Sequence, residues 1–378
     1  MLTSIVAVVL VLGGLIFFHE LGHFSVARAL GMGVTTFSLG FGPKLLRWKK
    51  GKTEYALSLI PLGGYVALVG ETEDQEIPPG FTANEVFSLR PAWQRLLVVA
   101  AGPLTNIVLA WLLCWLLALG WGTPVPLPQV GGVLKDSPAE AAGIKPGDMI
   151  LAIDGQPVES WSAMAAVIAK GNGKTVELLL SRPDVPAAAN ATAEVSRSTE
   201  IHVRLTPKRS VRKTIFGEDE EAWLMGISSS GAVRLEQHGL ANAAWAGLRQ
   251  TADMLALTWQ GFVKLAQRVV PLDQVGGPIM IVQLVGKQAQ EGLPGVLALA
   301  ALISINLGIL NFLPIPVLDG GTIVFCLWEM IFRRPLHQKV LEYSMRIGIA
   351  LLVMLMLLAT YNDIWRVIKS NGWFGSGS

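Results

Sequence analysis

The sequence predicts a polytopic α-helical membrane protein with about four transmembrane helices, a membrane-associated β-hairpin or sheet on the cytosolic side, and an inserted α+β domain on the extracytoplasmic side. Composition is the first observation: of 378 residues, 52% are hydrophobic and only 15% are charged, which is more apolar and less charged than soluble domains usually are. Four long apolar segments are the second, and one charged, glycine-rich segment between them is the third. The net charge of +2 is too small to indicate a nucleic-acid partner.

The first apolar segment, 1–30, is long enough to cross a bilayer, which takes about 20 residues. Near its end stand His19, Glu20 and His23 in the pattern His-Glu-x-x-His. Positions i and i+4 share one face of a helix, so both imidazoles can reach the same metal ion. Glu20 is the residue type that acts as general base beside such a metal. The alternative is two ordinary helix histidines, which apolar surroundings disfavour because unpaired polar groups there are costly.

The segment 31–95 is expected to lie on the cytosolic side and to contain strands over 34–69. An excess of basic residues places it there by the positive-inside rule, and leaves the N-terminus outside. These residues are Arg28, Lys44, Arg47, Lys49, Lys50, Lys52, Arg90 and Arg95. Turn glycines interrupt the strands at Gly40, Gly42, Gly63 and Gly64. Two interpretations stay open: a small cytosolic hairpin, or an edge strand close to the metal that pairs with an unwound substrate and is positioned by these glycines.

A second span is predicted over 96–121. It contains Gly-Pro-Leu-Thr-Asn ending at Asn106, where small residues permit close helix contact and the asparagine can hydrogen-bond a neighbour. Simple helix packing is at least as good an interpretation of Asn106 as substrate positioning.

The segment 122–235 is predicted to be the inserted domain. Its Val-Gly-Gly-Val sequence and the later Ser-Pro-Ala-Glu-Ala-Ala-Gly-Ile-Lys-Pro-Gly-Asp resemble a bacterial PDZ domain. By that resemblance, backbone amides around Gly131 and Gly132, between Val130 and Val133, would hold a peptide carboxylate beside an added strand. A folded module with an occluded groove is the alternative.

The rest of the chain is expected to return to the membrane. We predict an interfacial amphipathic helix and linker over 236–292, because its apolar residues alternate with charges. A third span over 293–321, a cytosolic loop over 322–344 and a fourth span over 345–366 follow. The tail 367–378 ends in Gly-Ser-Gly-Ser, which is set aside as an appended stretch.

Asp319 is the candidate for a third metal ligand. Counted at ~1.5 Å per residue, it reaches the cytosolic boundary after about 33 Å, roughly the depth at which the first span places its histidines. Two prolines precede it in Asn311-Phe-Leu-Pro-Ile-Pro-Val-Leu-Asp-Gly-Gly, and such broken helix is tolerated at membrane depth only when it is buried or lines a cavity. A fourth ligand position would remain for water.

Together, these motifs resemble the site-2 proteases, and more closely the bacterial RseP-type regulators of intramembrane proteolysis. The resemblance implies one Zn²⁺ per chain held by His19, His23 and Asp319, Glu20 as catalytic base, and Asn311 as a substrate-positioning residue. It also implies a bacterial cytoplasmic (inner) membrane location, with the active site near the cytosolic leaflet. Expected substrates are single-span membrane proteins such as anti-sigma factors, and signal peptides. The best-known proteobacterial members have two PDZ domains, whereas only one is found here.

Two competing hypotheses come from other classes of protein. The first is a membrane-anchored PDZ peptide-binding receptor with a vestigial metal site, which would not need His23. The second is a lipid-modifying enzyme or a metal transporter, for which more intramembrane histidines or acids would be expected than this sequence has. The complete ligand set with Glu20 favours a protease.

Overall fold

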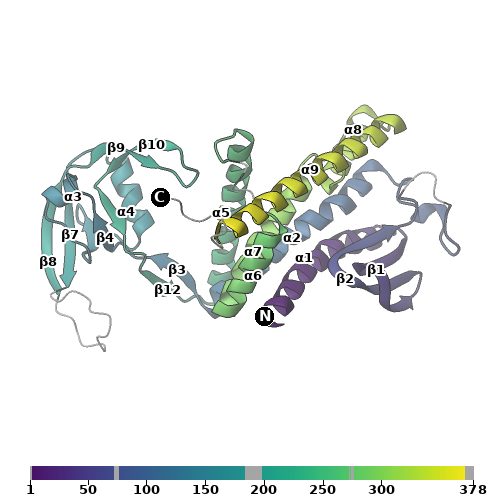
Figure 1. The fold of residues 1–378 in the computed structure, drawn as a ribbon, viewed down its shortest axis with the longest axis horizontal. Helices are drawn as coiled ribbons and strands as arrows, with labels where there is room; N and C mark the ends of the chain where they lie inside the picture. The colour runs from purple at the N-terminus through teal and green to yellow at the C-terminus, as the bar shows by residue number, and fades with distance from the viewer. Residues whose placement is uncertain (1, 72–75, 184–197, 272, 274–275, 371–378) are drawn as a thin grey trace. The chain divides into compact units, whose positions relative to one another are not determined.

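The computed structural model of the chain describes residues 2–71, 76–183, 198–271, 273 and 276–370. They divide into two compact units (Figure 1). Unit 1 comprises Met1–Gly120 and Gly239–Ser378, and unit 2 comprises Trp121–His238. Each unit is described by itself.

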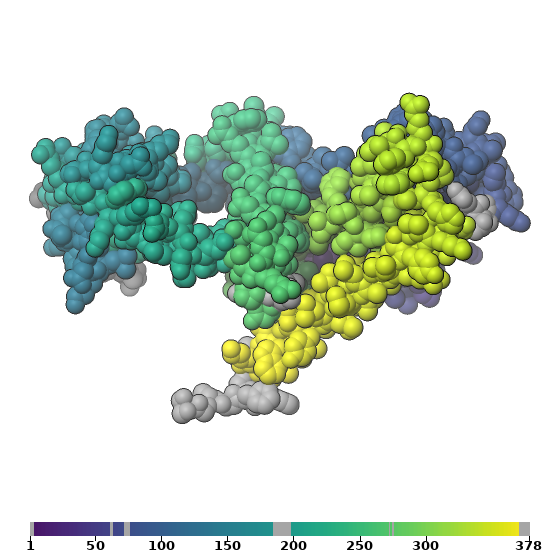
Figure 2. All heavy atoms as spheres, turned by 90° about the horizontal axis from the view of Figure 1, so that it is seen from above, coloured from purple at the N-terminus to yellow at the C-terminus, as the bar shows by residue number. Residues whose placement is uncertain are grey.

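Among the described residues, four helices are long and apolar enough to cross a membrane. They are α1 (Leu2–Ala29), α2 (Ala92–Gly120), α7 (Leu293–Phe312) and α9 (Gln338–Ser370). This agrees with the predicted number of spans. Many apolar side chains along α9 are exposed, including Ile347, Met354 and Leu357, and the helix forms a continuous ridge in the space-filling view (Figure 2). Exposed apolar surface of this kind is suited to contact with lipid rather than with water.

Helix α2 is the centre of unit 1, because α1, α5 (Leu240–Ala266), α7 and α8 (Asp319–Phe332) all pack against it. Small residues allow the close approach. A Cβ at Gly22 of α1 would lie 2.5 Å from the backbone oxygen of Ala101, and one at Gly247 of α5 would lie 2.6 Å from the backbone nitrogen of Trp115. The site described below depends on this tight packing of α1 on α2.

The segment 236–292, predicted as one interfacial helix and a linker, contains two helices, α5 and α6 (Pro278–Glu291). The linker prediction is therefore wrong over the residues of α6, which packs on α1, α7 and α9. The N-terminus of α6 is held by Asp363 of α9. This buried carboxylate accepts hydrogen bonds from the backbone amides of Gly277 (2.9 Å) and Met280 (3.0 Å). An acidic side chain satisfies the unpaired amides of a helix N-terminus, a long-range contact that local patterns do not reveal.

The predicted loop over 322–344 is also wrong in its first part, which is helix α8. The third span ends at Phe312, the chain is irregular through the two prolines, and a new helix begins at Asp319. The prolines remove backbone donors and end α7, but the apolar sequence after Asp319 resumes a helix of 14 residues. The remaining spans start earlier than predicted, α2 at Ala92 and α9 at Gln338, and the helix of α9 continues through 367–370 of the predicted tail.

A small sheet forms from two long strands, β1 (Val34–Lys50) and β2 (Thr53–Leu68), each of which folds back on itself. Tyr55 pairs with both Phe37 and Trp48, and Phe37 also pairs with Val66. The segments therefore lie in the order 44–50, 53–58, 34–39 and 64–68. The segment 64–68 is an outer edge, and no further strand pairs with it among the described residues. A short 3₁₀ helix, Ala83–Glu85, follows before α2.

Unit 2 contains ten strands and two helices among its described residues. They are β3 (Thr123–Pro126), β4 (Val130–Val133), α3 (Pro138–Ala141), β5 (Met149–Ile153), β6 (Gln156–Pro157), α4 (Trp161–Lys170), β7 (Val176–Pro183), β8 (Ser198–Leu205), β9 (Lys208–Lys213), β10 (Asp219–Leu224), β11 (Ile227–Ser229) and β12 (Val233–Glu236). The largest sheet has the order β6-β5-β7-β8, and β4 pairs with β11.

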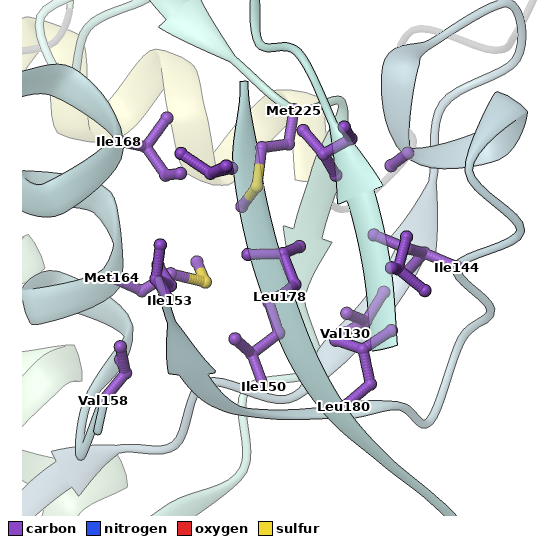
Figure 3. Packing of buried hydrophobic residues seen from close by; sticks show 14 residues of the cluster. Val130, Ile144, Ile150, Ile153, Val158, Met164, Ile168, Leu178, Leu180 and Met225 are labelled. Carbon is purple, nitrogen blue, oxygen red and sulfur yellow. The ribbon is translucent and has the colours of Figure 1, made fainter. Parts of the chain in front are cut away.

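The core of unit 2 lies between this sheet and α4. Ile150 and Ile153 of β5 and Leu178 and Leu180 of β7 are fully buried. They belong to one cluster with Met164 and Ile168 of α4, in which Ile153 lies beside Met164 and Leu180 lies near Val130 (Figure 3). In β7 the buried residues alternate with the period of two expected for a strand with one face on a core, whereas in β5 a register shift lies between Ile150 and Ala152. Unit 2 therefore has a hydrophobic core of its own.

Candidate metal centre

Three side chains from α1 and α8 converge in unit 1. The Nε2 atoms of His19 and His23 lie 3.2 Å apart. The Oδ2 atom of Asp319 lies 3.2 Å from the first of these nitrogens and 3.6 Å from the second. This oxygen is buried and has no hydrogen-bond partner of good geometry among the described residues. Two imidazole nitrogens and a carboxylate oxygen thus face one point.

The spacing of these three atoms fits a zinc ion. Zinc bonds of about 2.0–2.2 Å in tetrahedral geometry place ligand atoms roughly 3.3 Å from one another, close to the three distances found here. The buried carboxylate oxygen has no hydrogen-bond donor among the described residues, and the two facing nitrogens cannot both be protonated toward each other. A cation between the three atoms would explain both features. Imidazole and carboxylate ligands suit Zn²⁺.

Helix α2 orients the second histidine. His23 Nδ1 lies 2.9 Å from the backbone oxygen of Val98, which can only accept, so Nδ1 carries the proton and Nε2 is left free to bind metal. The approach of the two helices requires Gly102. A Cβ at this position would lie 2.3 Å from His23 Nε2 and 2.8 Å from His19 Cε1. The glycine therefore makes room for both rings.

The loop between α7 and α8 positions the third candidate ligand, Asp319. Asp319 is the first residue of α8, directly after the proline-containing turn. A Cβ at Gly320 would lie 2.1 Å from the backbone oxygen of Leu313, and one at Gly321 would lie 2.4 Å from Cα of Pro316. The two glycines let the start of α8 fold tightly onto the turn, which fixes the carboxylate opposite α1.

A pocket of about 550 Å³ opens beside the three ligands. Its wall includes Glu20, which follows His19 on α1, and the outer sheet segment, through Tyr65, Val66 and Leu68. Gly64 of the same segment approaches Glu20 so closely that a Cβ there would lie 3.2 Å from the glutamate Cγ. A carboxylate, a candidate metal site and a free strand edge therefore share one cavity.

Comparison with known proteins identifies the family of the chain. The model of peptidase family M50 matches residues 7–355. The chain belongs to peptidase family M50. Among its relatives, a Campylobacter jejuni protein that carries the name of a putative zinc metalloprotease is 37% identical, over 96% of this chain and 93% of the relative. The regulator of sigma-W protease RasP of Bacillus subtilis is 27% identical over 96% and 99% of the two chains. The metalloprotease MmpA of Caulobacter vibrioides is 29% identical over 97% and 96%.

Membership of family M50 makes the chain a metalloprotease of the site-2 protease type. The structure brings together four of the residues that the sequence predicts for its active site, His19, Glu20, His23 and Asp319. Asn106 is fully buried, and its side-chain amide lies 3.1 Å from His19 Nδ1.

Apart from Gly64, the other residues predicted to position substrate either do not line the pocket or serve to shape the sheet. Asn311 stands in the last turn of α7, half-buried, and does not line the pocket. Gly40 and Gly42, with φ of 93° and 84°, form the bend of β1, and an added Cβ at Gly63 would collide with the ring of Phe41. These three glycines build the folded sheet, whereas Gly64 alone contacts the site.

The predicted peptide groove of unit 2 lies on β4. Val130, Gly132 and Val133 pair with Ser229, Ser228 and Ile227 of β11. A Cβ at Gly131 would lie 2.5 Å from the backbone oxygen of Ser229. One side of β4 is thus occupied by β11, and the backbone of Val130 is also hydrogen-bonded to Gly147 and Asp148. The groove stays a prediction.

Sequence reasoning missed several residues that shape the M50 site. Val98 supplies the carbonyl that orients His23, and Arg95 of α2 forms an ion pair with Glu329 of α8 at the pocket wall. Val98 acts through its backbone oxygen, so its residue type gives no sequence signal of this role. The opposite charges of Arg95 and Glu329 are compatible with an ion pair, but nothing in the sequence shows that their two helices lie side by side.

Proposed function

We propose that this metalloprotease is an intramembrane zinc endopeptidase that cleaves the transmembrane segments of single-span membrane proteins. The observation that supports this most directly is the grouping of His19, His23 and Asp319 beside Glu20, in a pocket bordered by helices long enough to cross a membrane. Ionisable residues in such a setting are costly and point to function.

The three ligands would hold one zinc ion per chain. When bound, zinc supplies Lewis acidity toward the scissile carbonyl and toward the attacking water. Glu20 acts as the general base: its carboxylate takes the proton of the attacking water and delivers it to the amine that leaves. The buried position of the site limits bulk water to what the pocket admits, which strengthens the electrostatic contacts there.

Access to the peptide bond requires the substrate helix to unwind, because a helix keeps its carbonyls in internal hydrogen bonds. The outer segment 64–68 supports this step. Its free edge borders the pocket, and an extended substrate could add there as a further strand through main-chain hydrogen bonds. Gly64, which has no side chain beside Glu20, allows the substrate backbone to approach the base.

The proposed substrates are anti-sigma factors and signal-peptide remnants. Support comes from the relative in B. subtilis, whose name describes a regulator of sigma-W. The proposed location is the bacterial cytoplasmic membrane, with the site near the cytosolic leaflet. The basic residues around the sheet and the start of α2 favour the cytosolic side for that end of unit 1, which leaves the N-terminus and the PDZ-like unit 2 extracytoplasmic.

The experiment compares cleavage and zinc content in one preparation. The full chain in detergent micelles is incubated with a tagged single-span peptide, with and without a chelator. We expect wild type to cleave within the membrane segment, Glu20→Gln to retain zinc and lose about 10²–10⁴-fold of its rate, and His23→Ala to lose zinc and activity together. Full activity of Glu20→Gln, or activity that survives complete removal of zinc, would overturn the proposal. Peptide binding to unit 2 with no cleavage by wild type would favour a receptor.

A further inference from the structure

The feature that goes beyond the three ligands is the side chain of Asn106, in the middle of α2. Its amide nitrogen, as oriented in the structure, lies 3.1 Å from Nδ1 of His19. Its amide oxygen is buried without a hydrogen-bond partner among the described residues. The whole residue is 0% exposed, so water from the bulk cannot satisfy that oxygen.

This orientation conflicts with metal binding by His19. The Nε2 atom of His19 faces His23 and Asp319, so Nε2 must be unprotonated to bind zinc. A neutral imidazole then carries its proton on Nδ1. The Nδ1–H group would point at the NH₂ group of Asn106, and two donors would face each other.

Exchanging the two ends of the amide resolves the conflict. Nitrogen and oxygen of an asparagine amide are assigned from the surrounding hydrogen bonds, and a 180° rotation interchanges them. Before rotation, with zinc on Nε2, the His19 Nδ1–H, the Asn106 NH₂ and the Asn106 oxygen all lack partners. After rotation, the oxygen accepts from Nδ1–H, and only the NH₂ group lacks a partner.

We infer that Asn106 is a positioning residue whose side-chain carbonyl oxygen accepts a hydrogen bond from Nδ1–H of His19 and thereby holds Nε2 toward the metal. The inference rests on the proposed zinc site. It gives the two histidines matching supports from α2, since His23 Nδ1 already faces the backbone oxygen of Val98. Such partners of metal-binding histidines fix the tautomer and ring orientation.

The backbone around Asn106 is itself held in place. Ser304 of α7 donates a hydrogen bond from its hydroxyl to the backbone oxygen of Asn106 (2.7 Å). Gly308 of α7 brings the same stretch close, because a Cβ there would lie 3.1 Å from the backbone oxygen of Pro103. Both contacts are made to the backbone of α2 and neither touches the Asn106 amide, so the packing of α2 on α7, rather than the Ser304 hydroxyl alone, sets the position of the amide.

The test distinguishes loss of the hydrogen-bond acceptor at Asn106 from loss of side-chain packing at the same position. Zinc affinity is measured by chelator competition on the full chain in detergent for wild type, Asn106→Asp, Asn106→Leu and Ser304→Ala. Aspartate keeps an acceptor at the same position, and leucine keeps similar size without one. Ser304→Ala is the matched control, because it removes a buried hydrogen bond to the backbone of Asn106 and leaves the amide intact.

We expect Asn106→Leu to weaken zinc binding by about 10–100-fold, the usual effect of losing a partner of a metal-binding histidine. Asn106→Asp and Ser304→Ala should stay within a few-fold of wild type. The inference is overturned if the leucine variant binds zinc like wild type, or if a folded aspartate variant is as weak as the leucine variant.

A second measurement needs no variant at Asn106. In ¹⁵N-histidine-labelled wild type loaded with zinc, with His19 assigned by His19→Ala, the inference requires the metal on Nε2 of His19 and the proton on Nδ1. A proton on Nε2 with the metal on Nδ1 would overturn it. These readouts also separate the inference from the proposed function: wild type that binds zinc through His19 but cleaves no membrane peptide would reject the protease proposal and leave the role of Asn106 standing.

Discussion

The carboxylate of Asp319 and the imidazole of His19 come from opposite ends of the chain, and their nearest atoms are 3.2 Å apart. Two structural devices bring them together. On one side, Gly22 and Gly102 let α1 and α2 pack with the histidines between them; on the other, Gly320 lets α8 start tightly against the turn that follows α7. The geometry of the site therefore depends on how α1, α2 and α8 pack together. Small changes in that packing should lower metal affinity even where the fold is kept.

Replacing Asp319 with asparagine should remove the anionic ligand while keeping the size of the side chain. A neutral amide is a poorer zinc ligand than a carboxylate, so we expect zinc affinity to fall by more than the ~10–100-fold seen when only a supporting residue is lost. Chelator competition on the full chain measures the change. Zinc binding equal to wild type would contradict the assignment of Asp319.

Gly102→Ala should reduce zinc affinity and activity together. The new methyl group would lie within 3 Å of both imidazoles, so the rings must move, and a displacement of about 1 Å can cost about 10²-fold in rate. Gly120→Ala is the matched control on the same helix, since a Cβ there meets nothing within 4 Å. Equal zinc affinity and rate in the two variants would show that the close approach at Gly102 has no functional role.

The edge 64–68 should contact bound substrate. In a background with Cys114 and Cys326 replaced by alanine and Glu20 by glutamine, Val66→Cys should form a disulfide with a cysteine placed near the scissile bond of the substrate. Lys49→Cys is the control, because it lies in the opposite outer segment, 44–50. Cross-linking is read from gel mobility without reductant. Equal cross-linking at both positions would argue against strand addition at this edge.

Arg182→Met should destabilise unit 2. The buried carboxylate of Asp148 accepts two hydrogen bonds from the Arg182 guanidinium, both 2.8 Å long, and these bonds raise the pKa of Arg182. Loss of the arginine leaves a buried charge without its cation, which costs roughly 3 kcal/mol.

The control for that variant is Arg204→Met, because Arg204 pairs with Glu177 on the same sheet but both side chains are exposed, and such pairs contribute less than about 1 kcal/mol. Hydrogen exchange of unit 2 amides in the full chain reports the difference. Similar protection in the two variants would show that the Asp148–Arg182 pair does not stabilise the unit.

The sequence determined the features that depend on local pattern. Apolar length predicts the four candidate spans, and the i, i+4 spacing of His19 and His23 places both on one helix face. The motif around Asp319 also indicates the third candidate ligand, although the distance along the span is counted for one straight helix and the prolines end that helix at Phe312.

Only the tertiary structure decided how these pieces act together. The folding of β2 onto β1, which brings the edge 64–68 to Glu20, depends on long-range pairing, and so does the placement of α6 by Asp363. The contact of Asn106 with His19 arises because α1 and α2 pack through glycines. Local patterns determine which face of an element is apolar or which atoms can donate, but the partner of each atom is set by packing between segments that are distant in sequence.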